Sequence, residues 1–494
     1  MRGGLALGHI GLPGLPGYKG LSRTSSGGGF SYRLLGLGFW QAWWMIASRT
    51  DLVVSGDASW LPFDWVWLAP RNLFTIVTTF GYLAVALCAR HLRRPFSSNR
   101  SFFVLAAALT SLGTLFLAAM TSLKEPSALV LCAFAVALVM VALGNALTLF
   151  MWGELWSSLE TARVGRYLFA SYLFSFVLYF GLTAIPDALA MVADCLFPTV
   201  SVAVLWCSQT EPKRAGVGLD YDWDVSLPIR AAAFLFVVGA AHGFLQPYVA
   251  SLATGAGSVG VSFVVDVVLM VCLYAFVLLA QPEFEARPLF KAAVSAVVCG
   301  MALIMALPHD FAGAGNGIFL FGIHCFDMLI MLVASDIAFR KAIPIAYCFG
   351  ASIFVERLGT TVANVGYSGL LGIGSVGTAE TSAVAFPLFI AMLLVCTILF
   401  TEHDFMRLFQ PRPAVRQGSE RVEERCDAAA ETFRFTPRER EVLELVLLGR
   451  SGPYIAKELV ISENTVRNHM SNIYRKVGVY DRQSLLDVVN GVGR

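Results

Sequence analysis

The C-terminal part of the chain contains a helix-forming segment, 463–477, with two unlike faces. Its polar face carries Asn464, Arg467, Asn468, Ser471 and Arg475. Its apolar face carries Val466, Met470, Ile473 and Val477. Because these residues recur at the spacing of helical turns, the two sets lie on opposite sides of one helix. Amide, hydroxyl and guanidinium groups in such a row are suited to hydrogen bonds with base edges and phosphates.

Helix caps frame this segment on both sides. Thr436 followed by Glu439 forms a capping box at the start of a first helix. Ser462 is placed to cap the polar segment, and Gly478 is placed to end it. Asp481 would cap a last helix. With the short apolar run between the first two caps, these signals predict a small domain of four helices.

The strings Phe-Thr-Pro-Arg-Glu-Arg-Glu-Val-Leu and Ile-Ser-Glu-Asn-Thr-Val-Arg-Asn-His-Met-Ser resemble the LuxR-type helix-turn-helix. The resemblance implies that the third helix enters the major groove of double-stranded DNA. By position it implies base contacts from Arg467, Asn468 and Ser471, and backbone contacts from Thr465 and Lys476. The family often has a basic residue where this chain has Ser471. A small helical domain that binds protein is the alternative interpretation.

The rest of the chain has the composition of a membrane protein. Of the 494 residues, 57% are hydrophobic and 14% are charged, whereas soluble domains carry nearer a quarter charged. Between residues 31 and 401 we find about twelve apolar stretches long enough to span a bilayer. The chain therefore divides into a disordered tail, 1–30, a lipid-embedded domain, 31–401, a linker, 402–432, and the DNA-binding domain, 433–494.

The basic residues predict the orientation. With both ends inside, the inner segments hold sixteen Lys and Arg and the outer loops hold three, Arg49, Arg71 and Lys124. This asymmetry follows the positive-inside rule. We therefore expect a multi-pass protein of a bacterial inner membrane with both termini in the cytoplasm, where DNA is.

The spans also fall into two sets of six around the longest inner loop, 208–228. This layout resembles the major facilitator superfamily, in which two six-helix halves surround a central site. The loop 90–95 is basic but lacks the glycine and acidic residue of that family's signature. The resemblance is therefore one of fold, an all-α bundle, and does not imply transport.

Catalytic motifs are missing from the sequence. We find no nucleophile elbow, phosphate loop or zinc-spacing cluster, so we expect no enzyme activity, no catalytic residues, no metal and no cofactor. The ten cysteines are scattered through apolar runs without a Cys-x-x-Cys, as small buried hydrophobes are. A phospho-receiver domain is also missing, which leaves the membrane domain as the candidate sensor.

Four ionisable residues lie inside spans of the second half, Asp266, Asp327, Glu356 and Arg357. Such residues are costly in lipid and usually face an interior or a water-filled cavity. Neighbours on a helix point about 100° apart, so Arg357 is expected to meet Asp327 or Asp266 and not Glu356. Three carboxylates around one Arg would hold a proton or attract a cationic or polar ligand. We predict a sensor pocket here; a purely structural ion pair is the alternative.

Together these features favour a membrane-bound one-component transcription regulator controlled by a small-molecule ligand. The basic excess of residues 433–494, ten Lys and Arg against seven Asp and Glu, is modest. We therefore expect a homodimer on an inverted-repeat operator. The same features also fit two alternatives: a transporter with a regulatory DNA-binding module, and a DNA-binding protein whose membrane domain is only an anchor.

Overall fold

The apolar stretches form long helices. The computed structural model describes residues 31–54, 69–89, 91–92, 95–123, 127–159, 161–211, 229–252, 257–280, 286–306, 311–341, 344–372, 378–395, 426–447 and parts of 455–489. All regular elements in these ranges are helices. Two short ones are η1 (Tyr32–Gly36) and η3 (Phe96–Ser98). The first six long ones are α1 (Leu37–Arg49), α2 (Pro70–Ala89), α3 (Arg100–Leu123), α4 (Ala128–Ser157), α5 (Thr161–Thr183) and α6 (Asp187–Ser208). The next six are α7 (Ile229–Leu252), α8 (Gly257–Ala280), α9 (Ala286–Ala306), α10 (Ala312–Lys341), α11 (Ile345–Gly372) and α12 (Thr378–Leu394).

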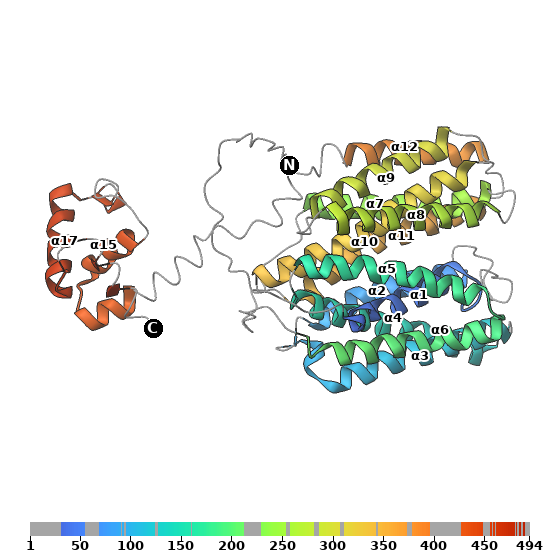
Figure 1. Ribbon diagram of the computed structural model, residues 1–494, viewed down its shortest axis with the longest axis horizontal. Coiled ribbons are helices and arrows are strands. Elements are labelled where there is room, and N and C mark those ends of the chain that lie inside the picture. Colours follow the sequence, from blue (N-terminus) through green and yellow to red (C-terminus); the bar gives the residue numbers. More distant parts are fainter. Residues whose placement is uncertain are drawn as a thin grey trace, which may run out of the picture.

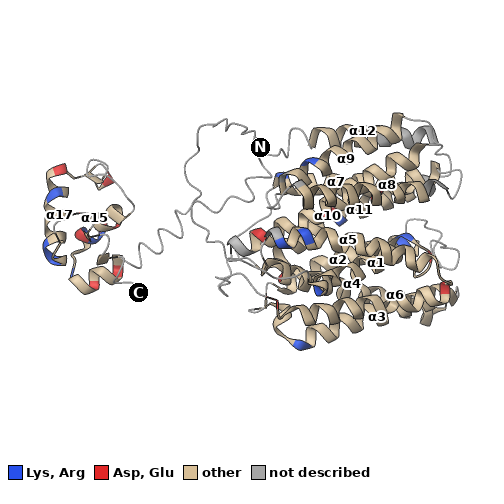
Figure 2. Ribbon diagram, viewed as in Figure 1, with Lys and Arg blue, Asp and Glu red and all other residues tan. Residues whose placement is uncertain are grey.

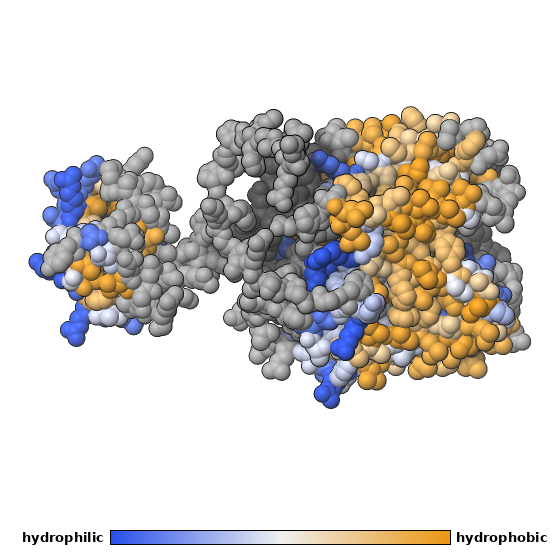
Figure 3. All heavy atoms as spheres, in the orientation of Figure 1, coloured by the Kyte–Doolittle hydropathy of each residue, from blue (hydrophilic) through white to orange (hydrophobic). Residues whose placement is uncertain are grey.

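These helices make the protein a polytopic membrane protein. Within the described residues, nine helices, α2 to α10, are long and apolar enough to cross a bilayer. Helices α1 and α12 have only 13 and 17 described residues, and α11 contains two charged residues near its middle. A count of twelve spans therefore stays a prediction. Apolar side chains cover the face of the bundle drawn in Figure 3. Val104, Leu129, Val177 and Leu279 are among the exposed apolar residues of the bundle, which suits contact with lipid.

The bundle has two halves. Helices α1 to α6 pack mainly on one another, as do α7 to α12 (Figure 1). Across the boundary, α11 packs on α2 and α4, and α10 packs on α4 and α5. Helix α5 also packs on α8. The two sets of six expected from the sequence are therefore present, and α10 and α11 form most of the seam between them.

Glycines bring α7 and α11 into backbone contact. A Cβ atom on Gly239 would lie 1.9 Å from the carbonyl oxygen of Glu356, and one on Gly243 would lie 2.0 Å from that of Thr360. From the other side, a Cβ on Gly359 would lie 2.1 Å from the carbonyl oxygen of Phe236. Gly239 and Gly243 form a Gly-x-x-x-Gly pair, a pattern that lets membrane helices approach closely. This contact fixes the height of Glu356 in the bundle.

Lys and Arg gather at one end of the bundle (Figure 2). Helices that follow one another run in opposite directions, so the odd-numbered helices all begin at this end. The first two turns of these helices carry Arg100, Arg163, Arg166, Arg230 and Lys291. At the other end, Arg71 of α2 forms an ion pair with Asp51.

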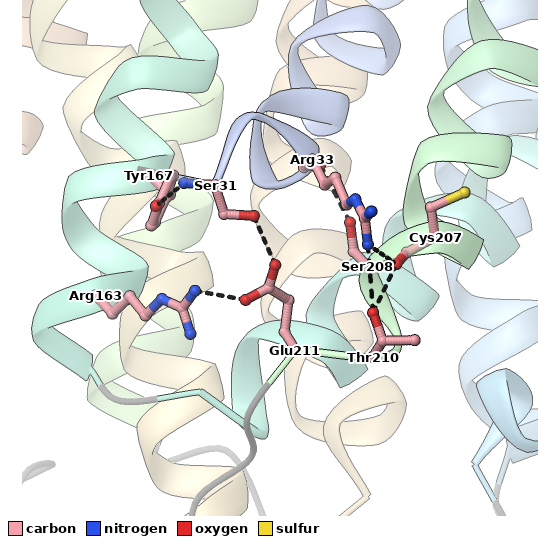
Figure 4. Close-up of polar contacts among 8 residues, drawn as sticks. All are labelled: Ser31, Arg33, Arg163, Tyr167, Cys207, Ser208, Thr210 and Glu211. Atoms are coloured by element: carbon pink, nitrogen blue, oxygen red, sulfur yellow. Dashed lines mark hydrogen bonds and ion pairs between the residues drawn. The ribbon is translucent and has the colours of Figure 1, made fainter. Parts of the chain in front are cut away.

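A polar network at this basic end holds the start of the first helix (Figure 4). Glu211, just after α6, accepts hydrogen bonds from Ser31 and from Arg163 of α5. Arg33 donates to the carbonyl oxygen of Cys207 and to Thr210. Burial alone would raise the pKa of Glu211, but the hydrogen bonds from Ser31 and Arg163 and the positive charge of Arg163 lower it. The network ties η1 to the ends of α5 and α6.

The C-terminal domain has its own core around α15 (Pro437–Leu447) and α17 (Glu463–Val477). The expected capping box is confirmed: the Thr436 N–H donates to Glu439 Oε2 at 2.8 Å, and the Glu439 N–H donates to Thr436 Oγ1. Ser462 accepts from the Thr465 N–H at the start of α17, and Asp481 accepts from the Ser484 N–H.

The end of α17 also agrees with the sequence. Gly478 has φ +81°, the left-handed conformation that favours glycine, and its N–H donates to the carbonyl oxygen of Tyr474. The apolar face is buried at Val466 and Ile473, while Met470 and Val477 pack at its edge.

One boundary differs from expectation. Residues 426–433 are helical, and Cys426 and Ala429 are fully buried in the core of the C-terminal domain. The folded unit therefore begins within the segment expected to be linker, before residue 433. The charged residues around this helix hid its apolar face, which consists of few and small side chains.

Candidate DNA-binding surface and buried charged cluster

The polar face of α17 is exposed. Arg467, Asn468 and Ser471 all lie on the surface of the domain, and among the described residues no internal partner holds the Arg467 guanidinium. Residues 467 and 471 are one turn apart, so these three side chains form one patch. The patch offers one guanidinium, one amide and one hydroxyl group for groove contacts.

The other three predicted DNA contacts have internal partners. Thr465 is half-buried, and its hydroxyl lies 2.8 Å from the hydroxyl of Ser462 within the cap. Arg475 donates to Asn472 one turn earlier on the exposed side of α17. The roles of both as DNA contacts stay predictions.

Lys476 is placed differently from the free backbone contact that the sequence suggested. Its ammonium nitrogen lies 2.6 Å from Glu439 Oε2 and 3.0 Å from the carbonyl oxygen of Arg434. Burial alone would raise the pKa of Glu439, but the hydrogen bonds from Lys476 and Thr436 and the charge of Lys476 hold that pKa below its ordinary value. A DNA phosphate would have to compete with Glu439 for Lys476. The main role of Lys476 is therefore to stabilise the fold of the domain.

This ion pair predicts an acid-sensitive domain. Because Glu439 has a lowered pKa in the folded state, its stabilisation is complete above its ordinary pKa of 4.5 and is lost as the pH falls below that. Glu439→Gln should lower the free energy of unfolding by about 2 kcal/mol at pH 7. It should also flatten the dependence of stability on pH below 4.5.

Urea unfolding of residues 424–494 between pH 3 and pH 7 measures both effects. Glu463→Gln, which changes an exposed carboxylate at the start of α17, is the matched control and should retain the wild-type pH dependence. Equal stability of Glu439→Gln and wild type at pH 7 would contradict the assignment.

The structure brings three of the four predicted pocket residues together in the membrane domain. Arg357 Nη2 of α11 lies 3.6 Å from Asp327 Oδ1 of α10. Contrary to expectation, Arg357 Nε also lies 3.0 Å from Glu356 Oε2. The long side chains bend towards each other, although their Cβ atoms point apart. Trp44 of α1 covers the guanidinium at 5.4 Å, so this group of charges joins both halves of the bundle.

Asp266 takes a different partner. This fully buried α8 residue has its Oδ2 atom 2.9 Å and its Oδ1 atom 3.2 Å from His324 Nδ1 of α10. His324 Nε2 lies 3.4 Å from Arg49 Nη2. Arg49 was expected in an outer loop; it is the last residue of α1 and is half-buried. Neither contact has a signal in the sequence, because a lone His and an Arg at the end of a span are common.

The carboxylates differ in accessibility. The Asp327 and Arg357 side chains are 18% and 14% exposed, whereas the Glu356 side chain is 4% exposed and also accepts a hydrogen bond from Thr360. Asp327 is therefore the most exposed of the three carboxylates, because the Asp266 side chain is 0% exposed. With His324 neutral, three carboxylates face two guanidinium groups, and the cluster carries one net negative charge. One bound cation or proton would neutralise it.

Comparison with known proteins places the C-terminal domain. The family described as bacterial regulatory proteins, luxR family, matches residues 434–489. The spore germination protein GerE of Bacillus subtilis is 55% identical over 48 residues, which are 10% of this chain and 65% of that protein. The CsgBAC operon transcriptional regulatory protein of Escherichia coli is 37% identical over 62 residues, which are 13% of this chain and 29% of that protein. This chain thus spans less than two thirds of the length of both relatives.

The membrane domain has a structural neighbour. The crystal structure of a bacterial homologue of the iron transporter ferroportin, in an outward-facing state, aligns with a TM-score of 0.50 and 15% identity. The alignment covers 76% of this chain and 97% of that one. At this identity the likeness concerns the fold, and it agrees with the two-half helical layout. Residues 434–489 therefore form a helix-turn-helix DNA-binding domain of the LuxR family, joined in one chain to a polytopic membrane domain.

Proposed function

We propose that this protein is a membrane-bound one-component transcription regulator that acts without catalysing a reaction. In this proposal α17 reads a DNA sequence, and the charged cluster of the membrane domain receives the signal. One observation carries it: the chain that holds the exposed face of α17 also holds a buried charged cluster that crosses the two halves of its bundle. A membrane anchor alone needs no such cluster.

The proposed location is a bacterial inner membrane, with both termini in the cytoplasm. The Lys and Arg residues at one end of the bundle support this orientation, because basic residues stay on the cytoplasmic side. It also puts the LuxR-family domain in the compartment that contains DNA.

The proposed ligand is a small molecule or ion that meets Asp327. A ligand shifts an equilibrium only if it binds one state better than the other. Asp327 of α10 pairs with Arg357, which stacks on Trp44 of the opposite half. A cation at Asp327 would weaken its pairing with Arg357 and change the contact between the halves, so binding would favour one arrangement of them.

The proposed active form on DNA is a homodimer. One α17 offers three free groove-facing side chains, Arg467, Asn468 and Ser471, which is few for specific binding. Two copies on an inverted repeat would double these contacts and the phosphate contacts with them. The membrane domain would then act by changing how readily two DNA-binding domains meet.

If the cluster controls the DNA-binding domain, a change at Asp327 should alter transcription. Asp327→Asn removes the accessible charge and preserves the size of the side chain. We expect target transcripts to change by at least about fivefold, as a coupling of 1–3 kcal/mol implies. Quantitative transcript measurements in cells, with protein levels measured in parallel, provide the test.

Asp187→Asn is the matched control, because this exposed residue begins α6 away from the cluster. It should leave transcripts unchanged. If Asp327→Asn, Asp266→Asn and Glu356→Gln all reach normal levels and leave target transcripts unchanged, the sensor assignment is wrong and the pocket does not lie in this cluster.

A transporter with a regulatory DNA-binding module is the second candidate. The fold likeness to a transporter homologue and the buried charges between two halves favour it. The two candidates differ in net movement of solute. Accumulation of a transcript-inducing compound inside vesicles that contain the full chain would favour the transporter, and saturable binding without accumulation would favour the sensor.

A further inference from the structure

His324 links the two halves of the bundle. On one side its Nδ1 atom lies within 2.9–3.2 Å of both oxygens of Asp266 on α8. On the other side its Nε2 atom lies 3.4 Å from Arg49 Nη2 at the end of α1. The His324 side chain is 2% exposed, and its ring packs against Tyr172 and Phe176 of α5.

The chemistry of the two neighbours defines the protonation state of the ring. A carboxylate only accepts hydrogen bonds, so Nδ1 must carry the hydrogen that Asp266 receives. A guanidinium only donates, so Nε2 must present a lone pair to Arg49. Both contacts are satisfied together only by the neutral ring with its hydrogen on Nδ1.

We propose that His324 and Asp266 form a proton-binding site, and that a proton at His324 Nε2 excludes the contact with Arg49. The proton comes from water and adds to the lone pair that Arg49 uses. Arg49 keeps its own hydrogens, so two donors of like charge would then face each other. The Asp266 carboxylate stabilises the charged ring, and Arg49 must move away.

The other charged and titratable groups around this site allow Arg49 to leave His324 for another carboxylate. Arg49 also experiences the charge of Asp327 of α10 and of Arg357 of α11, and lies near Tyr179 of α5. His242 of α7 experiences the charges of Arg357, Arg49 and His324. Asp327 is held only loosely by Arg357, at 3.6 Å, and so offers the displaced Arg49 a carboxylate.

The consequence is a proton-dependent link between α1 and α10. An effect of this link on transcription rests on the proposed function. The existence of the proton-binding site does not rest on it. Hydrogen exchange of residues 45–54 tests it without DNA or ligand. The full chain, in nanodiscs of phosphatidylethanolamine and phosphatidylglycerol, is compared at pH 5.5 and pH 7.5 after correction for intrinsic exchange. Loss of a hydrogen bond to a charged group should speed exchange of this segment about tenfold at pH 5.5.

His324→Gln has a side chain that can accept from Arg49 but cannot take up a proton in this range, so its exchange should not depend on pH. Asp266→Asn removes the carboxylate that stabilises the charged ring and should reduce the acceleration of exchange at pH 5.5. Arg49→Gln should exchange fast at both pH values. His91→Gln, a control at an exposed histidine outside the cluster, should behave as wild type.

Exchange that is independent of pH in the wild type would overturn the proposal, as would a wild-type pH response in His324→Gln. If His324→Gln does not fold, Arg49→Gln decides, because a pH response that persists without Arg49 also overturns it. An unchanged transcript level at all pH values, with the exchange result as expected, would instead count against the proposed function alone.

Discussion

Replacing Gly243 with Ala should strongly lower the thermal stability of the membrane domain. The added Cβ would lie 2.0 Å from the carbonyl oxygen of Thr360. This atom belongs to the backbone, so the clash cannot be relieved by turning a side chain, and α7 and α11 must move apart. Overpacking in a tight core costs about 1–3 kcal/mol or more; we expect the upper end, because Gly239 and Gly359 share the contact. Fluorescence-detected size-exclusion chromatography after heating measures the loss.

Gly181→Ala is the control for this substitution. It adds the same methyl group to a membrane helix, on α5, where nothing lies within 4 Å of the new Cβ. We expect wild-type thermal stability. A Gly243→Ala protein as stable as Gly181→Ala would show that α7 and α11 do not touch as described. It would also contradict the position of Glu356, because this contact fixes the height of that residue in the bundle.

Replacing Arg467 with Ala should weaken specific DNA binding by about 1–3 kcal/mol, a factor of roughly 5 to 150 in Kd. Arg467 is exposed on the polar face of α17, and no described residue competes for its guanidinium. If it holds a guanine through two hydrogen bonds, its loss should also relax specificity at that one base pair. Titration of residues 424–494 on the operator and on single-base variants, at fixed salt, measures both.

Arg440→Ala removes the same charge from α15, where Arg440 pairs with Asp427. It should reduce affinity for all sequences alike and leave base preference unchanged. Unaltered binding by a folded Arg467→Ala domain at moderate salt would show that α17 does not enter the groove through this face.

The DNA-binding domain could be predicted closely because its determinants are local. Thr436 and Glu439, Ser462, and Gly478 each act on a backbone within a few residues, and all three structural signals appear as expected. The role of Lys476 could not be predicted in the same way. Its partner Glu439 is 37 residues away, and the pairing depends on how α15 crosses α17.

The membrane domain shows the same division between local and distant features. Apolar length indicated the spans, and the cost of charge in lipid indicated Asp266, Asp327, Glu356 and Arg357. Which charges meet depends on helix packing. Asp266 meets His324 of another helix. Neither this pair nor the approach of Arg49 to His324 has a sequence signal, whereas the Gly-x-x-x-Gly pair 239–243 was a readable signal for the close approach of α7 and α11.

We expect the membrane-embedded chain to bind specific DNA sites through α17. Immunoprecipitation of crosslinked chromosomal DNA with the full-length protein tests it most directly, with Arg467→Ala expressed at the same level in the same membrane. We predict discrete sites that share an inverted repeat with half-sites about one helical turn apart, and their loss in Arg467→Ala. Enrichment without discrete sites, or sites that persist in Arg467→Ala, would contradict the claim.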